Sequence, residues 1–226
     1  MRRALSICLA CLLLWVSAPS AKASALIVYR HAGSGTQMRI ALTFDDGPHP
    51  RYTPVILDIL AEYGVSATFF AVGENAALYP QLLQRAAAEG HEIANHTYHH
   101  YHVGDLEGKQ LATEITDCSR LLERITDKHV QYFRPPEGVC SDAVKCFCRE
   151  NELTIILWSV DTRDWAHTEV SEIVKNVREN TKNGSIILMH DFIGKNSPTP
   201  AALRRIIPML QESGYEFVTV SQLLEG

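Results

Sequence analysis

The chain has 226 residues, 46% of them hydrophobic and 21% charged, which is a globular composition and enough chain for one domain with a substantial core. Its formal net charge is −5, and an acidic chain is a poor partner for nucleic acid. Composition and charge therefore argue against a nucleic-acid-binding protein, but they do not define a fold.

The N-terminus has the pattern of a secretory signal over residues 1–23. Arg2 and Arg3 precede an apolar run over residues 4–16, and small residues follow up to Ala23. The run is shorter than the roughly 20 residues of a membrane-spanning helix, so we expect a cleaved signal, with a retained N-terminal anchor as the alternative. Cleavage would leave 18 Lys and Arg against 26 Asp and Glu. The sequence thus predicts a secreted or cell-envelope protein with no permanent membrane span.

A lead-in segment over 24–38 is expected to precede a single domain over 39–226, in which short β-branched or aromatic runs alternate with longer helical patterns. This alternation predicts an α/β fold with parallel strands. The strand candidates cover 39–44, 66–72, 92–95, 131–134, 154–160, 185–189 and 216–220. The first helix is expected to begin at Thr53-Pro54 and to end at Gly64. Periodicity leaves a closed barrel and an open doubly wound sheet equally possible.

Several strand candidates end in polar side chains. These side chains are Asp45, Asp46, His96, Arg134, Asp161, Asp164 and His190. Ligands bind at the carboxyl ends of parallel strands in barrels and in open sheets alike. We therefore expect these residues to form one functional site.

The Asp-Asp-Gly-Pro sequence that begins at Asp45 is by itself typical of a β-turn. His96 and His100 change its interpretation, because histidines four apart face one side of a helical turn and can bind one ion. Two histidines and one aspartate leave coordination positions for water, as in catalytic metal sites. Zinc is favoured outside the cell, although the same set suits ferrous iron. A histidine-rich surface loop is the non-functional alternative.

Two further interactions are expected at the same strand ends. Arg134 supplies a permanent cation that could hold a carboxylate through two parallel hydrogen bonds. His190 could pair with Asp161 or with Asp164, which would raise the pKa of the histidine. Together with a metal ion, these groups would make a hydrolytic site with a base and an acid.

Four cysteines lie outside the predicted signal, namely Cys118, Cys140, Cys146 and Cys148. An even number in a compartment that permits disulfides favours disulfides or buried thiols, with the pairing undetermined. The spacing of the last three matches no structural zinc pattern, so a cysteine metal site is the weaker interpretation.

In order along the chain, these strings resemble the motifs of the NodB-homology polysaccharide deacetylases, a carbohydrate-esterase family that includes chitin and peptidoglycan deacetylases. The strings cover residues 43–48, 96–100, 134–136, 161–165 and 188–190. The resemblance extends over residues 39–226 and implies a single NodB-homology catalytic domain with a distorted (β/α)7 barrel. It also implies a divalent metal, with Zn2+ first and Co2+ or another divalent ion as alternatives.

The resemblance also implies a role for each motif residue. The implied metal ligands are Asp46, His96 and His100. The implied catalytic residues are Asp45 as the base, Arg134 as its orienting cation, His190 as the acid and Asp164 as the carboxylate that tunes it. The implied substrate-binding residues are Pro135, Glu137, Trp165 and Leu188. The implied reaction is the removal of N-acetyl groups from an N-acetylglucosamine-containing polysaccharide, peptidoglycan or a chitin-type oligomer. We expect the enzyme to be a monomer.

One residue departs from the family pattern. Glu137 stands where the third motif usually has a tyrosine, whose backbone N–H would help to bind the oxyanion. A carboxylate near a developing negative charge is unfavourable unless it points to solvent or binds substrate. Two alternatives therefore stay open, an O-acetyl esterase of the acetylxylan type and a carbohydrate-binding homologue with impaired catalysis.

Overall fold

The computed structural model describes residues 26–33 and 36–225. The predicted signal over residues 1–23 lies outside the described residues. Within the described ranges, no helix is both long enough and apolar enough to cross a membrane.

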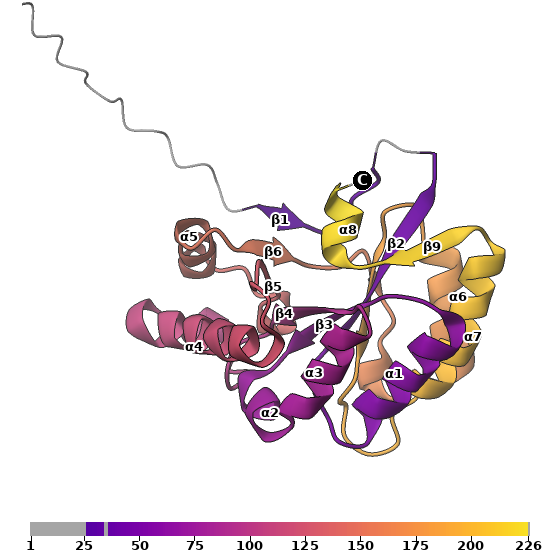
Figure 1. Cartoon of the computed structure of the whole chain (residues 1–226). Helices are drawn as coiled ribbons and strands as arrows, with labels where there is room; N and C mark the ends of the chain where they lie inside the picture. The colour runs from indigo at the N-terminus through magenta and orange to yellow at the C-terminus, as the bar shows by residue number, and fades with distance from the viewer. Residues whose placement is uncertain (1–25, 34–35, 226) are drawn as a thin grey trace, which may run out of the picture.

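The fold is built on one parallel sheet that curls across the molecule (Figure 1). Its strands are β1 (Ile27–Val28), β2 (Met38–Asp45), β3 (Thr68–Ala71), β4 (Glu92–Asn95), β5 (Tyr132–Phe133), β6 (Thr154–Ile156), β7 (Val160–Asp161), β8 (Ile186–His190) and β9 (Tyr215–Val218). They follow the order β1-β6-β5-β4-β3-β2-β8-β7, and β9 pairs with the first half of β2. All ladders between these strands are parallel, as predicted.

Helices connect the strands and cover the sheet. They are α1 (Tyr52–Tyr63), α2 (Gly73–Leu78), α3 (Pro80–Ala88), α4 (Gly108–Thr126), α5 (Asp142–Glu150), α6 (Val170–Asn180), α7 (Thr199–Glu212) and α8 (Val220–Glu225). In Figure 1, α7 packs beside both α1 and α6. Gly64 ends α1 in the left-handed conformation, with φ of 62°, as its place after the helical pattern predicts.

The alternation of side chains along β2 separates the core from the site. Leu42 and Phe44 are fully buried in the largest apolar cluster, together with side chains of α1, α6 and α7. Thr43 and Asp45 point to the opposite face of the strand, where both contact Arg134. The strand therefore uses one face for stability and presents its polar residues on the other.

The strand predicted over 154–160 is divided into β6 and β7. Where β6 ends, the guanidinium of Arg134 donates hydrogen bonds to the carbonyl oxygens of Ile156 at 3.0 Å and Leu157 at 3.2 Å. The chain resumes at β7, which pairs with β8 instead of β5. A second difference is β1, which comes from the lead-in segment and pairs with β6 at the edge of the sheet.

The four cysteines of the described residues are free thiols. Cys118 and Cys148 are buried in apolar clusters, and burial raises the pKa of Cys148 to about 12. The sequence allowed disulfides or buried thiols, and the structure shows thiols that are buried or half-buried.

Candidate active site

A groove of about 540 Å³ opens at the carboxyl ends of the strands. It is lined by Asp45, Asp46, His96, His100, Glu137, Trp158, Asp161, Trp165, Leu188 and His190. Nine of these ten residues were singled out in the sequence, and Trp158 is added. A larger groove, of about 920 Å³, lies at the opposite ends of the strands, and its Arg39 and Glu216 form an ion pair with each other.

The two neighbouring aspartates lie in different environments. Asp45 is the last residue of β2, and only 3% of it is exposed. Asp46 has a left-handed backbone, with φ of 76°, and its side chain is 26% exposed. Both carboxylates line the groove, but Asp45 is buried at its wall and Asp46 is more exposed.

Arg134 is fully buried behind Asp45. It donates hydrogen bonds to Asp45 Oδ1 at 2.6 Å and to Thr43 Oγ1 at 2.9 Å, and it lies 4.0 Å from the ring centre of Phe70. Burial lowers the pKa of Arg134, whereas the charge of Asp45 raises it, and a guanidinium keeps its proton under these opposed effects. Asp45 receives one hydrogen bond from Arg134 and not the two parallel bonds that the sequence suggested. The other bonds of the guanidinium go to the backbone of 156–157.

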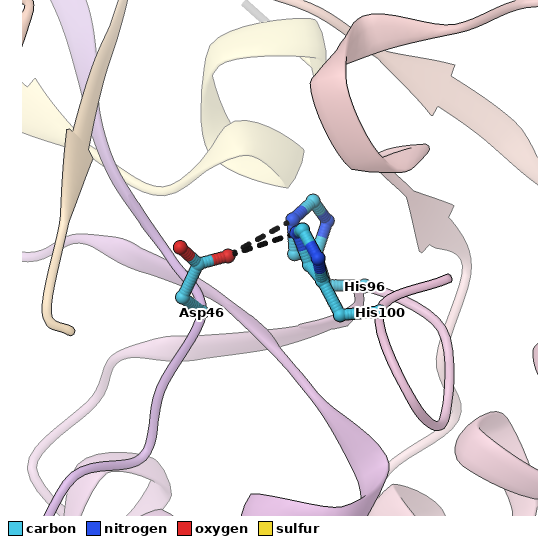
Figure 2. A group of neighbouring side chains, drawn as sticks. All are labelled: Asp46, His96 and His100. Carbon is cyan, nitrogen blue, oxygen red and sulfur yellow. Dashed lines mark ion pairs between the residues drawn. The ribbon is translucent and has the colours of Figure 1, made fainter. Parts of the chain in front are cut away.

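Asp46, His96 and His100 converge on one point of the groove (Figure 2). Asp46 Oδ1 lies 3.4 Å from His96 Nε2 and 3.2 Å from His100 Nε2. Burial raises the pKa of Asp46, but hydrogen bonds from His100 and His96 outweigh it and hold the pKa well below its usual range. The hydrogen bond with Asp46 raises the pKa of His100. Three ligand atoms within 4.8 Å of one another fit a single metal ion.

The tautomer of His96 also suits metal binding. His96 Nδ1 lies 2.7 Å from the backbone oxygen of Arg134, which can only accept a hydrogen bond. In the neutral ring, Nδ1 therefore carries the proton, and the lone pair of Nε2 would be available to a metal ion beside Asp46 and His100. Such outer contacts fix the orientation of histidine ligands in metal sites.

The two histidines are not on a helix, so the helical-turn argument for their spacing was wrong. They lie in the loop after β4, in which Thr97 and His100 have left-handed φ values of 68° and 57°. Asn95 Oδ1 accepts from the backbone N–H of Thr97 at 2.7 Å, and Thr97 Oγ1 accepts from that of His100 at 3.1 Å. Side-chain hydrogen bonds therefore form the turn that brings the histidines together.

Glu114 of α4 supports the same loop, and the sequence did not point to it. It is 5% exposed, and its Oε2 accepts from the backbone N–H groups of Tyr98 at 3.1 Å and His99 at 2.8 Å. Its Oε1 lies 2.6 Å from His99 Nδ1. The sequence signal that could have pointed to Glu114 is an acidic residue on the apolar face of an amphipathic helix.

His190, at the end of β8, pairs with Asp164 and not with Asp161. His190 Nδ1 lies 2.8 Å from Asp164 Oδ1, and Asp164 Oδ2 accepts from Thr199 Oγ1 at 2.7 Å. Burial lowers the pKa of His190, but the hydrogen bond and charge of Asp164 and the charges of the Asp45–Asp46 pair outweigh it and raise the pKa to about 9. Asp161 instead accepts from the backbone N–H of Arg163.

The remaining predicted residues lie at the sides of the groove, with one exception. Trp165 is 49% exposed and Leu188 is buried, and both line the groove. Glu137 has a left-handed φ of 56°, and its side chain is 66% exposed and lies 3.8 Å from His102 Nε2. Its carboxylate thus points to solvent at the rim. Pro135 is buried and is absent from the lining.

The comparisons with known proteins agree with this geometry. The sequence model of a family described as polysaccharide deacetylase matches residues 32–156. The chain belongs to the polysaccharide deacetylase family. This confirms the family predicted from the five motifs, and with it the prediction of an enzyme of the deacetylase class.

Individual polysaccharide deacetylase relatives extend the likeness to most of the chain. A peptidoglycan-N-acetylglucosamine deacetylase of Bacillus cereus is 44% identical over 187 residues, 82% of this chain and 87% of that protein. The crystal structure of a peptidoglycan N-acetylglucosamine deacetylase in complex with 4-naphthalen-1-yl-N-oxidanyl-benzamide has a TM-score of 0.84 at 35% identity and covers 88% of this chain and 92% of its own. A family 4 acetyl xylan esterase from Clostridium thermocellum, in complex with a cobalt ion, has a TM-score of 0.77 at 32% identity, with coverages of 83% and 90%. These likenesses confirm the distorted (β/α)7 barrel.

Proposed function

We propose that this polysaccharide deacetylase is a metal-dependent hydrolase that removes N-acetyl groups from N-acetylglucosamine-containing polysaccharide, either peptidoglycan or chitin-type oligomers. The observation that carries the proposal is the Asp46–His96–His100 group, which shares one groove with a second aspartate and a third histidine, Asp45 and His190. A metal triad, a carboxylate base and an imidazole acid are the parts that amide hydrolysis requires.

Asp46, His96 and His100 would hold the metal ion, which we expect to be Zn2+. Nitrogen and carboxylate ligands in a three-residue set suit zinc, with cobalt or another divalent ion as substitutes. When bound, such an ion supplies a Lewis acid for the acetyl carbonyl and lowers the pKa of a coordinated water.

Asp45 is the proposed base. Arg134 holds its Oδ1 at 2.6 Å, and its Oδ2 lies 3.8 Å from His96 Nε2, on the side of the metal ligands. The held oxygen fixes the carboxylate, and the other oxygen is available to accept a proton from the attacking water. Its neighbour Asp46 has the separate task of binding metal, because its Oδ1 lies 3.4 Å from His96 Nε2 and 3.2 Å from His100 Nε2.

His190 is the proposed acid. Its raised pKa keeps the imidazole protonated at neutral pH, and Nδ1 is occupied by Asp164. The ring can therefore deliver its other proton to the leaving amine, and Asp164 stabilises the charged ring before transfer. The Asp164 carboxylate is itself held by Thr199.

The groove suits an acetylated sugar. Trp165 presents a half-exposed indole and Leu188 an apolar surface beside His190, which fits a sugar ring and an acetyl methyl group. The backbone N–H of Glu137 would bind the oxyanion, with the side chain of Glu137 directed away. We further propose that the enzyme acts as a monomer outside the cytoplasm, where such polymers lie.

Acetate release tests the proposal. Purified protein would be incubated with N-acetylglucosamine oligomers and with peptidoglycan, each with zinc and with a chelator. We expect acetate from at least one of these substrates, loss of the activity with the chelator and recovery on adding zinc. Absence of acetate from every acetylated glycan would refute the enzyme function and favour a carbohydrate-binding role.

An O-acetyl esterase is the second candidate, because the cobalt-bound neighbour is an acetyl xylan esterase. The same base and metal ligands could hydrolyse an ester, whose alkoxide leaving group depends less on an acid than an amine does. Rates on acetylxylan and on N-acetylglucosamine oligomers, measured side by side, separate the two functions. Faster acetate release from acetylxylan would identify the protein as an O-acetyl esterase.

A further inference from the structure

Asp191 follows His190 directly, and the proposed mechanism gives it no role. It is 1% exposed, and its Oδ1 has no hydrogen-bond partner among residues 26–33 and 36–225. Burying a carboxylate oxygen without a hydrogen-bond partner costs free energy, so this side chain calls for a structural explanation. The contacts of Asp191 with a neighbouring loop supply this explanation.

The Asp191 residue contacts the Asp45–His49 loop at alternate positions. Its backbone N–H donates to the carbonyl of Asp45 at 3.1 Å. Its Oδ2 accepts from Thr53 Oγ1 at 2.5 Å, and the same hydroxyl oxygen accepts from the backbone N–H of His49 at 2.7 Å. One residue therefore holds the loop directly at its start and through Thr53 at its end.

The third contact is with Gly47, in the middle of the loop. A Cβ atom at Gly47 would overlap both carboxylate oxygens of Asp191. Gly47 is not among the glycines with positive φ, so its missing side chain provides space and not backbone freedom. The loop thus lies directly on the carboxylate of Asp191.

The residue between these contacts is the metal ligand Asp46. Its φ of 76° is a conformation that residues other than glycine keep only where the surroundings hold them. Asn75 Nδ2 holds the carbonyl of Asp46 at 2.8 Å from the side of α2, and Asp191 supports the loop from the side of β8. A shift of Gly47 would rotate the carboxylate of Asp46 away from His96 and His100.

We infer that Asp191 is a positioning residue, which packs against Gly47 and so sets the direction in which Asp46 presents its carboxylate to the metal ion. This inference rests on the proposed function, since it concerns the metal site of that reaction. It predicts that substitutions at Gly47 and at Asp191 affect the metal affinity non-additively.

The test measures Zn2+ affinity by competition with a chromophoric chelator, at a temperature where circular dichroism shows each variant folded. Asp191→Ala should weaken zinc binding about tenfold or more, as is usual for outer partners of a metal site, and Asp191→Asn, which keeps the shape, should stay within about threefold. Gly47→Ala should also weaken zinc binding by about tenfold or more. The Gly47→Ala/Asp191→Ala double variant should bind zinc more tightly than Gly47→Ala alone, because the overlapping carboxylate is gone.

The absorption spectrum of the cobalt-substituted protein gives a second readout, since a rotated Asp46 changes the ligand field, whereas a loss of stability alone does not. An Asp191→Ala variant with the affinity and cobalt spectrum of the natural protein would overturn the inference. A double variant no better than Gly47→Ala would overturn it too. If Gly47→Ala does not fold, the comparison of Asp191→Ala with Asp191→Asn decides. Acetate release is measured separately, so a protein that binds zinc but releases no acetate refutes the proposed function and leaves this test intact.

Discussion

The pairing of His190 with Asp164 makes a prediction about pH. Replacing Asp164 by Asn keeps the size of the side chain and an oxygen for His190 Nδ1, but it removes the negative charge that opposes burial. With burial opposed only by the charges of Asp45 and Asp46, the pKa of His190 should fall from about 9 toward its ordinary value of about 6.5. The pairing is thus worth about 3 kcal/mol to the protonated imidazole, at about 1.4 kcal/mol for each pKa unit.

The expected loss of activity therefore grows with pH. At pH 8 about 90% of His190 is protonated in the natural protein and about 3% in the variant, a difference of about 30-fold. At pH 6 both proteins have most of the histidine protonated, so this contribution to the loss nearly vanishes. Any geometric damage from the substitution would multiply the rate by the same factor at every pH.

The assay is kcat/KM for acetate release from an N-acetylglucosamine oligomer between pH 5.5 and 9, at fixed zinc concentration. Asp161→Asn is the matched control, because Asp161 lines the same groove but bonds to the backbone of Arg163. The ratio of natural protein to Asp164→Asn should rise with pH, and the ratio for the control should stay flat. A ratio for Asp164→Asn that does not change with pH would refute the assignment of His190 as an acid tuned by Asp164.

Stability offers an independent check on the same pair. Because the folded pKa of His190 lies above its unfolded value, the pair stabilises the fold fully below about pH 6.5, and this contribution is lost as pH rises through about 9. The difference in melting temperature between the metal-free natural protein and Asp164→Asn should therefore be largest near pH 6 and shrink toward pH 9. A difference that grew with pH would contradict the raised pKa.

Four further substitutions test other parts of the site. Asp45→Asn should abolish acetate release while leaving zinc bound, and His100→Ala should lose zinc, both measured by metal analysis after dialysis; zinc loss from the first variant alone would exchange the roles of the two aspartates. Arg134→Met should cost about 3–5 kcal/mol in the free energy of unfolding by denaturant titration, because it leaves a buried carboxylate without its cation; a cost below about 1 kcal/mol would contradict a charged pair at this depth. Glu137→Gln should change kcat/KM on a neutral oligomer by less than about threefold, because the exposed carboxylate is screened by water; a tenfold gain would show that the acid impairs the oxyanion site.

Local sequence was enough to locate the candidate residues. Period-2 alternation along β2 and the buried run of β8 predict parallel strands, and the residue that follows such a strand lies at the functional end of the sheet. Asp45, His96 and His190 therefore came from strand patterns and spacing, and the likeness to the family supplied their roles. These signals are local, because they depend on neighbours along the chain.

The sequence argument failed where a feature depends on contacts between distant segments. The histidine loop after β4 is shaped by Asn95 and by Glu114 of α4, which no periodicity in 96–100 reveals. At the break between β6 and β7, the guanidinium of Arg134 donates to two backbone carbonyls that lie 22 and 23 residues away along the chain.

The sequence by itself determined the class of fold, the family and the set of polar residues at the ends of the strands, because hydrophobic period and motif order are properties of the chain alone. Only the tertiary structure decided that Glu137 points to solvent and that Asp191 lies against Gly47, and it shows the pairing of His190 with Asp164 that the family likeness implied. Each of these depends on how a side chain from one strand end meets a loop from another. Such a meeting is set by the curvature of the sheet and by packing, which spacing along the chain does not record.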